Sequence, residues 1–164
     1  MSNSTIMEND IIIRNYRTSD YEATLEILQQ LHSEFDIGLK EDQWKKSSGL
    51  RQFKPNLKRI TLIAEVKSTG EVVSMGMLEA VKNNLGQYIG YLDNWTTKKN
   101  YIGKGVGKIL ADRAIQILKS WGCTSVRINM SYNVSEKVID VICKSQGFTP
   151  ILIVLEKRFE VNND

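Results

Sequence analysis

The sequence predicts an α+β domain with three layers, in which a mixed, mostly antiparallel central sheet carries helices on both faces. Three observations support this fold class. Strand-like runs cluster between residues 60 and 97, a long amphipathic helix follows them directly, and a second strand and helix come after that helix. The predicted order of elements is β-α-α-β-β-β-α-β-α-β.

The N-terminal part is expected to hold one strand and two helices. Ile11-Ile12-Ile13 opens a strand that reaches about Tyr16. Ser19 and Glu22 have the spacing of a capping box, which predicts that a helix starts there. A second helix is expected over Glu41–Phe53, since the chain then meets Pro55.

The middle of the chain reads as an antiparallel meander. Its strands are expected over Ile60–Lys67, Glu71–Lys82 and Gln87–Thr97. The turns between them are Ser68-Thr69-Gly70 and Asn83-Asn84-Leu85-Gly86, which are rich in turn-forming residues.

The C-terminal part alternates between helix and strand. Apolar residues recur every three to four positions from Val106 to Trp121, and Gly122 is placed to end that helix in a left-handed conformation. After this helix we expect a strand over Thr124–Met130, a helix over Asn133–Gln146 that stops at Gly147, and a last strand over Ile151–Phe159.

The bulk properties exclude several classes of protein. The length of 164 residues suits one domain, expected over residues 11–160, behind a flexible tail of residues 1–10. A net charge of +3 without a clustered basic face argues against nucleic acid. Two cysteines and one histidine argue against a metal site, and no apolar run is long enough to span a membrane. We therefore expect a reduced, cytoplasmic protein, either monomer or homodimer.

A glycine-rich segment carries the functional signal. Gly103, Gly105 and Gly107 lie where a strand passes into the long helix. Glycine allows close approach of the backbone to a ligand, and the first turn of a helix offers free amides and a positive dipole end. Lys104 and Lys108 add positive charge. The segment predicts a site for phosphate or pyrophosphate, with a turn that binds nothing as the alternative.

Two common phosphate motifs do not match this segment. A Walker loop needs Ser or Thr after Gly-Lys, and here Ile109 follows Lys108. The dinucleotide fingerprint needs a third glycine three residues after Gly105, and it belongs to a β-α-β unit rather than to the end of a meander.

The segment Ile102–Gly107 resembles the signature of the GNAT acetyltransferase superfamily, except at its first position, where Ile102 stands in place of Arg or Gln. Cys143–Phe148 resembles the family's Tyr-x-x-x-Gly-Phe, and the order of elements agrees from Ile11 to Phe159. The resemblance implies a GNAT-like fold and acetyl-CoA as co-substrate. The residues that it implies for binding coenzyme A are Trp95, Thr96, Thr97, Ile102, Gly103, Lys104, Gly105, Val106, Gly107, Lys108 and Asn133. Backbone near Trp95 and Thr97 would pair with the pantetheine arm as an added strand.

Catalytic candidates follow from the chemistry of acyl transfer to an amine. Asp93 and Glu79 are candidates for the general base, each on a predicted strand. Strict alternation would place Asp93 on one face with Ile89, Tyr91, Trp95 and Thr97, where aromatic neighbours would raise its pKa. The resemblance implies an alternative, because a strand bulge at Asp93, common in the family, would break this alternation.

The general acid is the second open role. Cys143 stands where many family members have a tyrosine that protonates the leaving thiolate, and Cys143 or Tyr132 is the candidate to replace it. Cys143 as plain packing is the alternative.

These residues lead to an expected function. The chain is expected to be an N-acetyltransferase that transfers an acetyl group from acetyl-CoA to a primary amine of a small molecule or peptide, by direct attack in a ternary complex. Two alternatives remain at this stage, a non-catalytic or regulatory CoA-binding protein and a nucleotide-binding module of another class.

Overall fold

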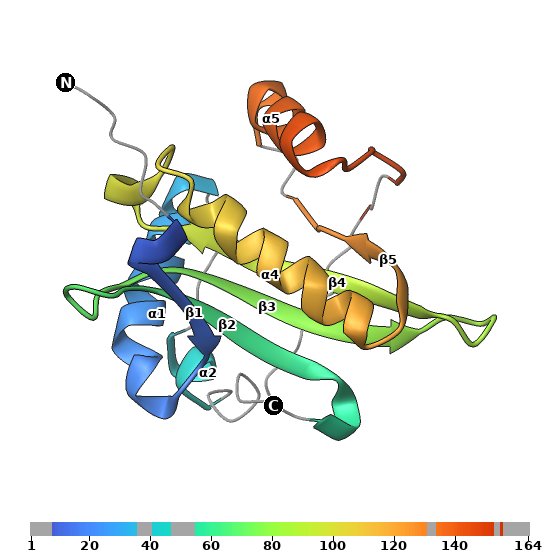
Figure 1. Ribbon diagram of the computed structural model, residues 1–164, viewed down its shortest axis with the longest axis horizontal. Coiled ribbons are helices and arrows are strands. Elements are labelled where there is room, and N and C mark those ends of the chain that lie inside the picture. Colours follow the sequence, from blue (N-terminus) through green and yellow to red (C-terminus); the bar gives the residue numbers. More distant parts are fainter. Residues whose placement is uncertain (1–7, 36–40, 47–54, 131–133, 153–154, 156–164) are drawn as a thin grey trace, which may run out of the picture. The chain divides into compact units, whose positions relative to one another are not determined.

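The computed structural model describes residues 8–35, 41–46, 55–130, 134–152 and 155 (Figure 1). The chain divides into two compact units, residues 1–133 and 134–164, and each is described by itself. The first unit holds the sheet and the second holds helix α5. The single domain expected over residues 11–160 therefore stays a prediction.

The first unit is built on a five-stranded sheet in the order β1-β2-β3-β4-β5. Its strands are β1 (Ile11–Asn15), β2 (Arg59–Val66), β3 (Val72–Lys82), β4 (Tyr88–Thr97) and β5 (Cys123–Arg127). The first four pair antiparallel, and β5 runs parallel to β4. The predicted mixed, mostly antiparallel sheet is confirmed.

Helices of the first unit cover both faces of this sheet. The α-helices are α1 (Tyr21–Phe35), α2 (Glu41–Lys46), α4 (Val106–Ser120) and, in the second unit, α5 (Glu136–Gln146). Short 3-10 turns span Glu8–Asp10, Thr18–Asp20, Pro55–Leu57 and Lys99–Tyr101. No helix of the described residues combines the length and the apolar composition that a membrane crossing requires.

Two apolar clusters hold the layers together. Leu110 and Leu118 of α4 pack with Leu78 and Leu92 of the sheet. On the other face, Ile27 and Leu28 of α1 and Trp44 of α2 pack with Ile63 and Met75. Each fully buried Leu or Ile contributes about 1.5–3 kcal/mol, so burial on both faces accounts for much of the stability of this unit.

The start of α1 differs from the prediction. The chain makes a 3-10 turn over Thr18–Asp20, and α1 begins at Tyr21 instead of being capped by Ser19. The Asp20 carboxylate accepts a hydrogen bond from the Arg17 N–H at 2.7 Å. Arg14 holds the same carboxylate at 2.7 Å, so a contact with β1 fixes Asp20 in this turn.

Other element bounds are close to those predicted. Gly122 and Gly147 end α4 and α5 with φ of +84° and +71°, as their positions indicated. β5 covers Cys123–Arg127 rather than 124–130. Helix α5 begins after Ser135, not at Asn133, which lies outside the described residues. The second half of the predicted helix over 41–53 lies outside them too.

The two ends of the predicted domain are described only in part. Residues 8–10 of the predicted tail form a 3-10 turn, and the Asp10 carbonyl accepts a hydrogen bond from Lys67 N–H at 2.9 Å. The predicted last strand falls mostly outside the described residues. Its described members, Ile151, Leu152 and Leu155, are not in a strand.

Candidate functional site

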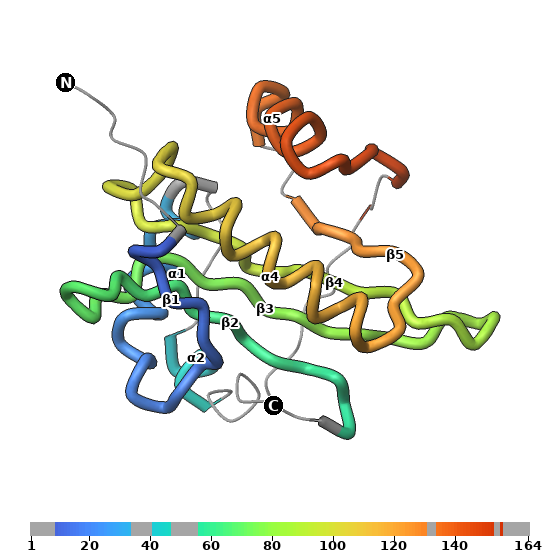
Figure 2. The backbone as a smooth tube through the Cα atoms, viewed as in Figure 1, coloured from blue at the N-terminus to red at the C-terminus, as the bar shows by residue number. Residues whose placement is uncertain are grey.

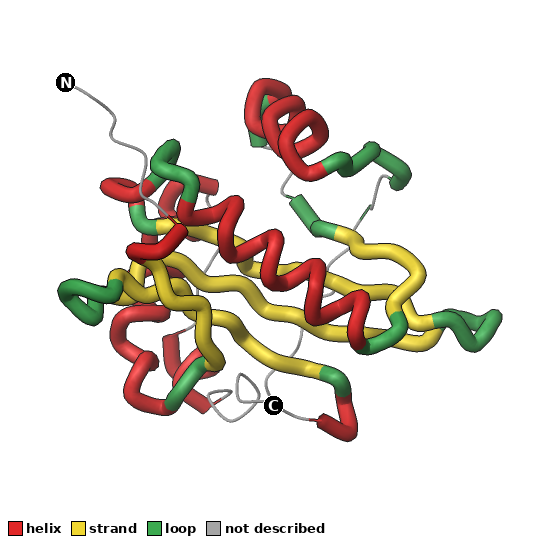
Figure 3. Tube along the Cα trace, in the orientation of Figure 1, coloured by secondary structure: helices red, strands yellow, loops and turns green. Residues whose placement is uncertain are grey.

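Strands β4 and β5 separate along their length. They pair only from Tyr88 to Tyr91, opposite Cys123 to Arg127, while β4 continues to Thr97 (Figure 3). From Leu92 to Thr97 the edge of β4 therefore has no strand beside it among the described residues. Outward N–H and C=O groups on such an edge can pair with an extended ligand, as in strand addition.

The glycine turn follows the open edge. From the end of β4 the backbone passes through the Lys99–Tyr101 turn into α4 (Figure 2). Gly103 and Gly105 have φ of +77° and +90°, conformations that residues with a Cβ rarely adopt. Gly105 is the N-cap of α4 and offers no side chain to satisfy the helix amides.

Free amides gather at the start of α4. The first hydrogen bond of the helix runs from Ile109 N–H to Gly105 C=O at 3.1 Å. The N–H groups of Val106, Gly107 and Lys108 come before this bond and have no acceptor within the helix. They lie at the positive end of a helix of 15 residues. Backbone donors with this arrangement suit a phosphate or pyrophosphate.

Two of the predicted phosphate contacts have other partners. The Ile102 and Lys104 amides donate to the carbonyls of Lys99 and Tyr101, both at 3.3 Å. The Ile102 side chain, in place of the family's Arg or Gln, is 57% exposed. We therefore place the turn's donors on the first residues of α4 rather than on Ile102.

The two lysines of the turn are held by neighbours. The Lys104 ammonium lies 5.3 Å from the centre of the Tyr101 ring. Lys108 forms an ion pair with Asp112 at 2.6 Å, one helical turn further along α4. That pair is solvent-exposed, so its cost of opening is small, about 0.3–0.5 kcal/mol.

Gly107 brings α4 close to β4. A Cβ at Gly107 would lie 3.3 Å from Thr97 Oγ1 and 3.6 Å from Trp95 Nε1. Trp95 and Thr97 therefore face α4. Thr96 lies between them, and its carbonyl accepts a hydrogen bond from the Ser74 hydroxyl at 2.8 Å. The predicted residues of β4 and of the turn are thus brought together at one place in the fold.

A β-bulge changes the predicted face of Asp93. The register between β3 and β4 shifts between Met75 and Met77, and Asn94 has φ of +47°. Asp93 lies opposite Met77, which packs against the α1 cluster. The prediction that Asp93 shares a face with Trp95 and Thr97 is wrong, because the extra residue at the bulge turns the strand over between them.

Asp93 lies in a small pocket with the other base candidate. The pocket has a volume of about 170 Å³ and is lined by Arg59, Met77, Leu78, Glu79, Asp93 and Asn94. Burial raises the pKa of Asp93 above its ordinary value. The hydrogen bond from Asn129 Nδ2 to Asp93 Oδ1, 3.1 Å long, lowers that pKa, and the charge of Glu79 raises it.

Glu79 is engaged by a cation. Arg59 donates two hydrogen bonds to Glu79 Oε1, from Nε at 3.1 Å and from Nη2, and forms an ion pair with it. The Glu79 oxygen that would take a proton from an amine is therefore already occupied by the Arg59 guanidinium. Of the two candidates, Asp93 is the better placed to take a proton.

The remaining catalytic candidates lie in the second unit or outside the described residues. Cys143 is a half-buried free cysteine in α5, within the second unit. Tyr132 and Asn133 lie outside the described residues. Their roles stay predictions, and no three Cys, His, Asp or Glu side chains of the described residues form a group that could hold a metal ion.

Two polar residues of the site were absent from the sequence-based predictions. Arg59 begins β2, and Asn129 follows β5. The signal for Asn129 is the parallel pairing of β4 with β5, which brings the ends of both strands to one edge of the sheet. Arg59 has a cross-strand signal, since it lies directly opposite Glu79.

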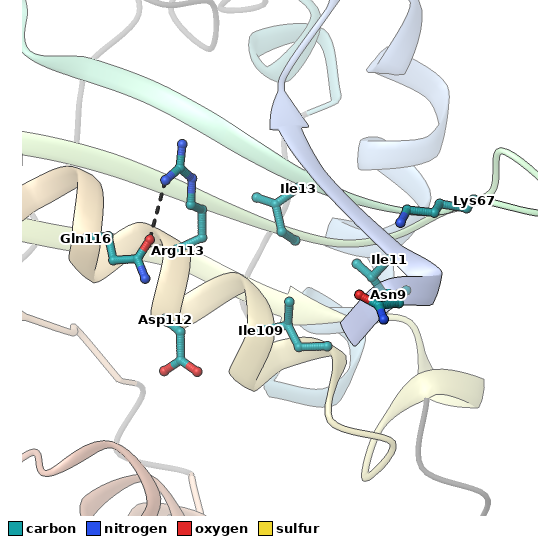
Figure 4. A pocket seen from close by; sticks show the side chains of 8 residues that line it. All are labelled: Asn9, Ile11, Ile13, Lys67, Ile109, Asp112, Arg113 and Gln116. Atoms are coloured by element: carbon teal, nitrogen blue, oxygen red, sulfur yellow. Dashed lines mark hydrogen bonds between the residues drawn. The ribbon is translucent and has the colours of Figure 1, made fainter. Parts of the chain in front are cut away.

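A larger pocket, of about 340 Å³, lies between β1 and α4 (Figure 4). It is lined by Asn9, Ile11, Ile13, Lys67, Ile109, Asp112, Arg113 and Gln116. Strand β1 is at the opposite end of the sheet from β5, away from the open edge of β4. We therefore do not assign this pocket to the site.

Comparisons with known proteins identify the family of the chain. The model of the acetyltransferase (GNAT) family matches residues 21–148. Among curated protein sequences, no relative matches the chain.

Solved structures share the fold at low sequence identity. An acetyltransferase from Trypanosoma brucei is 22% identical, with a TM-score of 0.71 over 92% of this chain and 100% of its own. Glucosamine-6-phosphate N-acetyltransferase from Arabidopsis thaliana is 20% identical, with a TM-score of 0.69 over 92% and 99%. An aminoglycoside N-acetyltransferase solved with CoA is 14% identical, with a TM-score of 0.72 over 92% and 95%. The family model spans most of the chain and the folds agree, so the chain belongs to the GNAT family of acetyltransferases.

Proposed function

We propose that the chain is an N-acetyltransferase that transfers an acetyl group from acetyl-CoA to a primary amine of a small molecule or peptide. The observation that carries the proposal is the open edge of β4, which leads from the glycine turn towards the bulge beside Asp93. The amides of Val106, Gly107 and Lys108 would bind the pyrophosphate. The edge near Trp95 and Thr97 would pair with the pantetheine arm.

Asp93 would act as the general base. A primary amine with a pKa near 10 arrives mostly as ammonium and must lose a proton before its nitrogen attacks the thioester carbon. The raised pKa of Asp93 suits it to accept that proton. The C–N bond then forms, the C–S bond breaks, and the departing thiolate takes the second proton of the nitrogen, which leaves a neutral amide and a thiol.

The leaving group makes a modest demand on the protein. A thiol with a pKa near 8.5 lies about 1.5 units above pH 7, which corresponds to roughly 2 kcal/mol. Direct attack in a ternary complex therefore does not depend on a strong general acid, and Cys143 or Tyr132 would give only assistance.

The charge of the Asp93 pocket favours a cationic acceptor. Two carboxylates, Asp93 and Glu79, face one guanidinium, Arg59, so the lining has one excess negative charge when both acids are ionised. Two structural neighbours are named as acetyltransferases of glucosamine 6-phosphate and of aminoglycosides. These two amines are the first acceptors to test.

The proposal is tested with the full chain, acetyl-CoA and a panel of amines that includes an aminoglycoside, glucosamine 6-phosphate, a polyamine and a peptide with a free N-terminus. We expect thiol release that depends on the amine, and an acetylated product by mass spectrometry. Calorimetry with CoA alone separates the alternatives. Binding without transfer to any acceptor would favour a non-catalytic CoA-binding protein, and no CoA binding would sink the proposal.

Gly105→Ala is expected to weaken CoA binding. At φ of +90° a Cβ is strained, and the left-handed region costs a non-glycine residue about 1–2 kcal/mol. Relief of that strain would move the free amides at the start of α4. The Kd for CoA, measured by calorimetry, should therefore rise about 5- to 30-fold. Gly86→Ala is the matched control, because Gly86 has φ of +76° in a loop away from the turn. Equal CoA affinity in the two variants would remove the turn from the binding site.

A further inference from the structure

A side chain of α1 binds the backbone at the end of β4. Gln30 Nε2 donates to the Thr97 carbonyl at 3.2 Å, and Gln30 Oε1 accepts from the Lys99 N–H at 2.8 Å. One amide thus satisfies two backbone groups that lie two residues apart. Neither the predicted binding residues nor the glycine motif includes Gln30.

Both groups lie on the outward edge of the chain. Lys98 N–H donates to the Val73 carbonyl at 2.8 Å, so Lys98 pairs with the β3 side. In an antiparallel ladder, alternate residues bond to the partner strand and the residues between them point away from it. The Thr97 C=O and the Lys99 N–H therefore point away from β3, to the edge that β5 leaves open.

The Gln30 amide occupies the place of one residue of an added strand. A residue of a parallel strand donates to the carbonyl before its partner and accepts from the N–H after it, and Gln30 makes this pair of bonds around Lys98. A ligand that adds to the edge of β4 therefore cannot bond to the Thr97 carbonyl and the Lys99 N–H, because Gln30 already does. Outward groups remain at Trp95 and at the Thr97 N–H.

Neighbouring contacts hold Gln30 and its partners in place. Glu26, one turn earlier on the same face of α1, forms an ion pair with Lys98 at 3.0 Å. Glu71 binds the Lys98 ammonium at 3.3 Å and accepts a hydrogen bond from the Tyr101 hydroxyl at 2.7 Å. The segment between β4 and the glycine turn is thus fixed from α1 and from the start of β3.

We propose that Gln30 is a positioning residue that ends the ladder on β4 and so sets the register of the pantetheine arm. The inference rests on the proposed function, since it takes acetyl-CoA as the ligand. A slip of one residue along a strand moves a ligand by about 3.3 Å. Such a slip would move the thioester relative to Asp93, and a displacement of 1 Å can already cost about 100-fold in rate.

The test compares Gln30→Ala and Gln30→Glu with the unsubstituted chain. Gln30→Glu keeps the length and the acceptor for Lys99 N–H but loses the donor to Thr97. Gln29→Ala is the matched control, because Gln29 is its exposed neighbour and bonds to Glu41 instead. Binding is measured by calorimetry for CoA and for 3′-phospho-ADP, which carries the pyrophosphate without the pantetheine arm, and kcat is measured with the best acceptor.

We expect Gln30→Ala to weaken CoA binding about 10-fold and to lower kcat about 10- to 100-fold, with 3′-phospho-ADP binding and the unfolding midpoint unchanged. Gln30→Glu should follow Gln30→Ala, and Gln29→Ala should match the unsubstituted chain. Equal losses for CoA and 3′-phospho-ADP would overturn the inference, since Gln30 would then only support the turn. Unchanged CoA affinity and kcat would overturn it as well. Failure of the unsubstituted chain to bind CoA would instead overturn the proposed function, and the inference with it.

Discussion

Asp93→Asn should lower kcat about 10²- to 10⁴-fold while the affinity for CoA stays the same. The amide has nearly the same shape as the carboxylate and keeps an oxygen for the Asn129 hydrogen bond, but it cannot accept the proton of the amine. Steady-state kinetics with a saturating acceptor, together with calorimetry for CoA, check both parts of this result.

The pH profile gives a second readout of Asp93. A base works only after it has lost its proton, so the rate should rise as pH increases through the pKa of Asp93. Because burial raises that pKa, the rise should occur at higher pH than an ordinary aspartate would give. Glu79→Gln removes a nearby negative charge and should move the rise to lower pH. If Glu79→Gln lowered kcat more than Asp93→Asn, the result would identify Glu79 as the general base.

Arg14→Met should destabilise the fold by about 3–5 kcal/mol, because it strips a buried carboxylate of its partner. The Arg14 guanidinium donates to both oxygens of Asp20, at 2.7 and 2.8 Å, and to Glu65 at 2.7 Å. Asp20 is 5% exposed, so its charge has little access to water. The unfolding free energy from urea titration measures the loss.

Lys46→Met is the control for this prediction. Lys46 pairs with Asp42 at 3.6 Å on the surface of α2, and its removal should change stability by less than about 0.5 kcal/mol. If Arg14→Met cost no more than Lys46→Met, the pairing of Arg14 with Asp20 and Glu65 would not stabilise the fold.

Acid should act on the same contact. Burial pushes the pKa of Asp20 up, but hydrogen bonds from Arg14 and the Arg17 N–H outweigh it and hold the pKa below its ordinary value. The stabilisation is therefore present above the pKa of an unfolded aspartate, near 3.9, and is lost as pH falls through the lower folded value. Arg14→Met should show a smaller loss of stability between pH 5 and pH 2 than the unsubstituted chain, by urea titration at each pH.

Much of the fold could be predicted because its signals are local. Gly122 and Gly147 mark helix ends by their left-handed conformation, and the helical spacing of α4 follows from residues close together in the sequence. The glycine turn belongs to the same class. Gly103 and Gly105 adopt the positive φ values that their residue type suggested.

The chemistry of the site was less predictable because its contacts are distant in sequence. Arg59 reaches Glu79 across 20 residues, and Asn129 reaches Asp93 across 36. Gln30 meets the backbone of Lys99 across 69. Such contacts depend on tertiary packing, which no local pattern encodes.

The bulge is the clearest failure of local reasoning. Alternation assigns every second residue of a strand to one face. A single extra residue in a left-handed conformation reverses the faces of the residues that follow it. Asn94 is among the few non-glycine residue types that adopt this conformation readily, but its presence in a strand does not announce a bulge.

Asn94 also divides β4 into two stretches whose side chains face opposite sides of the sheet. Before Asn94 the strand turns its acid, Asp93, towards the α1 side, and after Asn94 it turns Trp95 and Thr97 towards α4. Under the proposed function, substitutions before Asn94 would change the acceptor pocket and leave unchanged the side chains that face α4. If the proposed function holds, a strand divided in this way lets the acceptor change in small steps while the acyl donor stays the same.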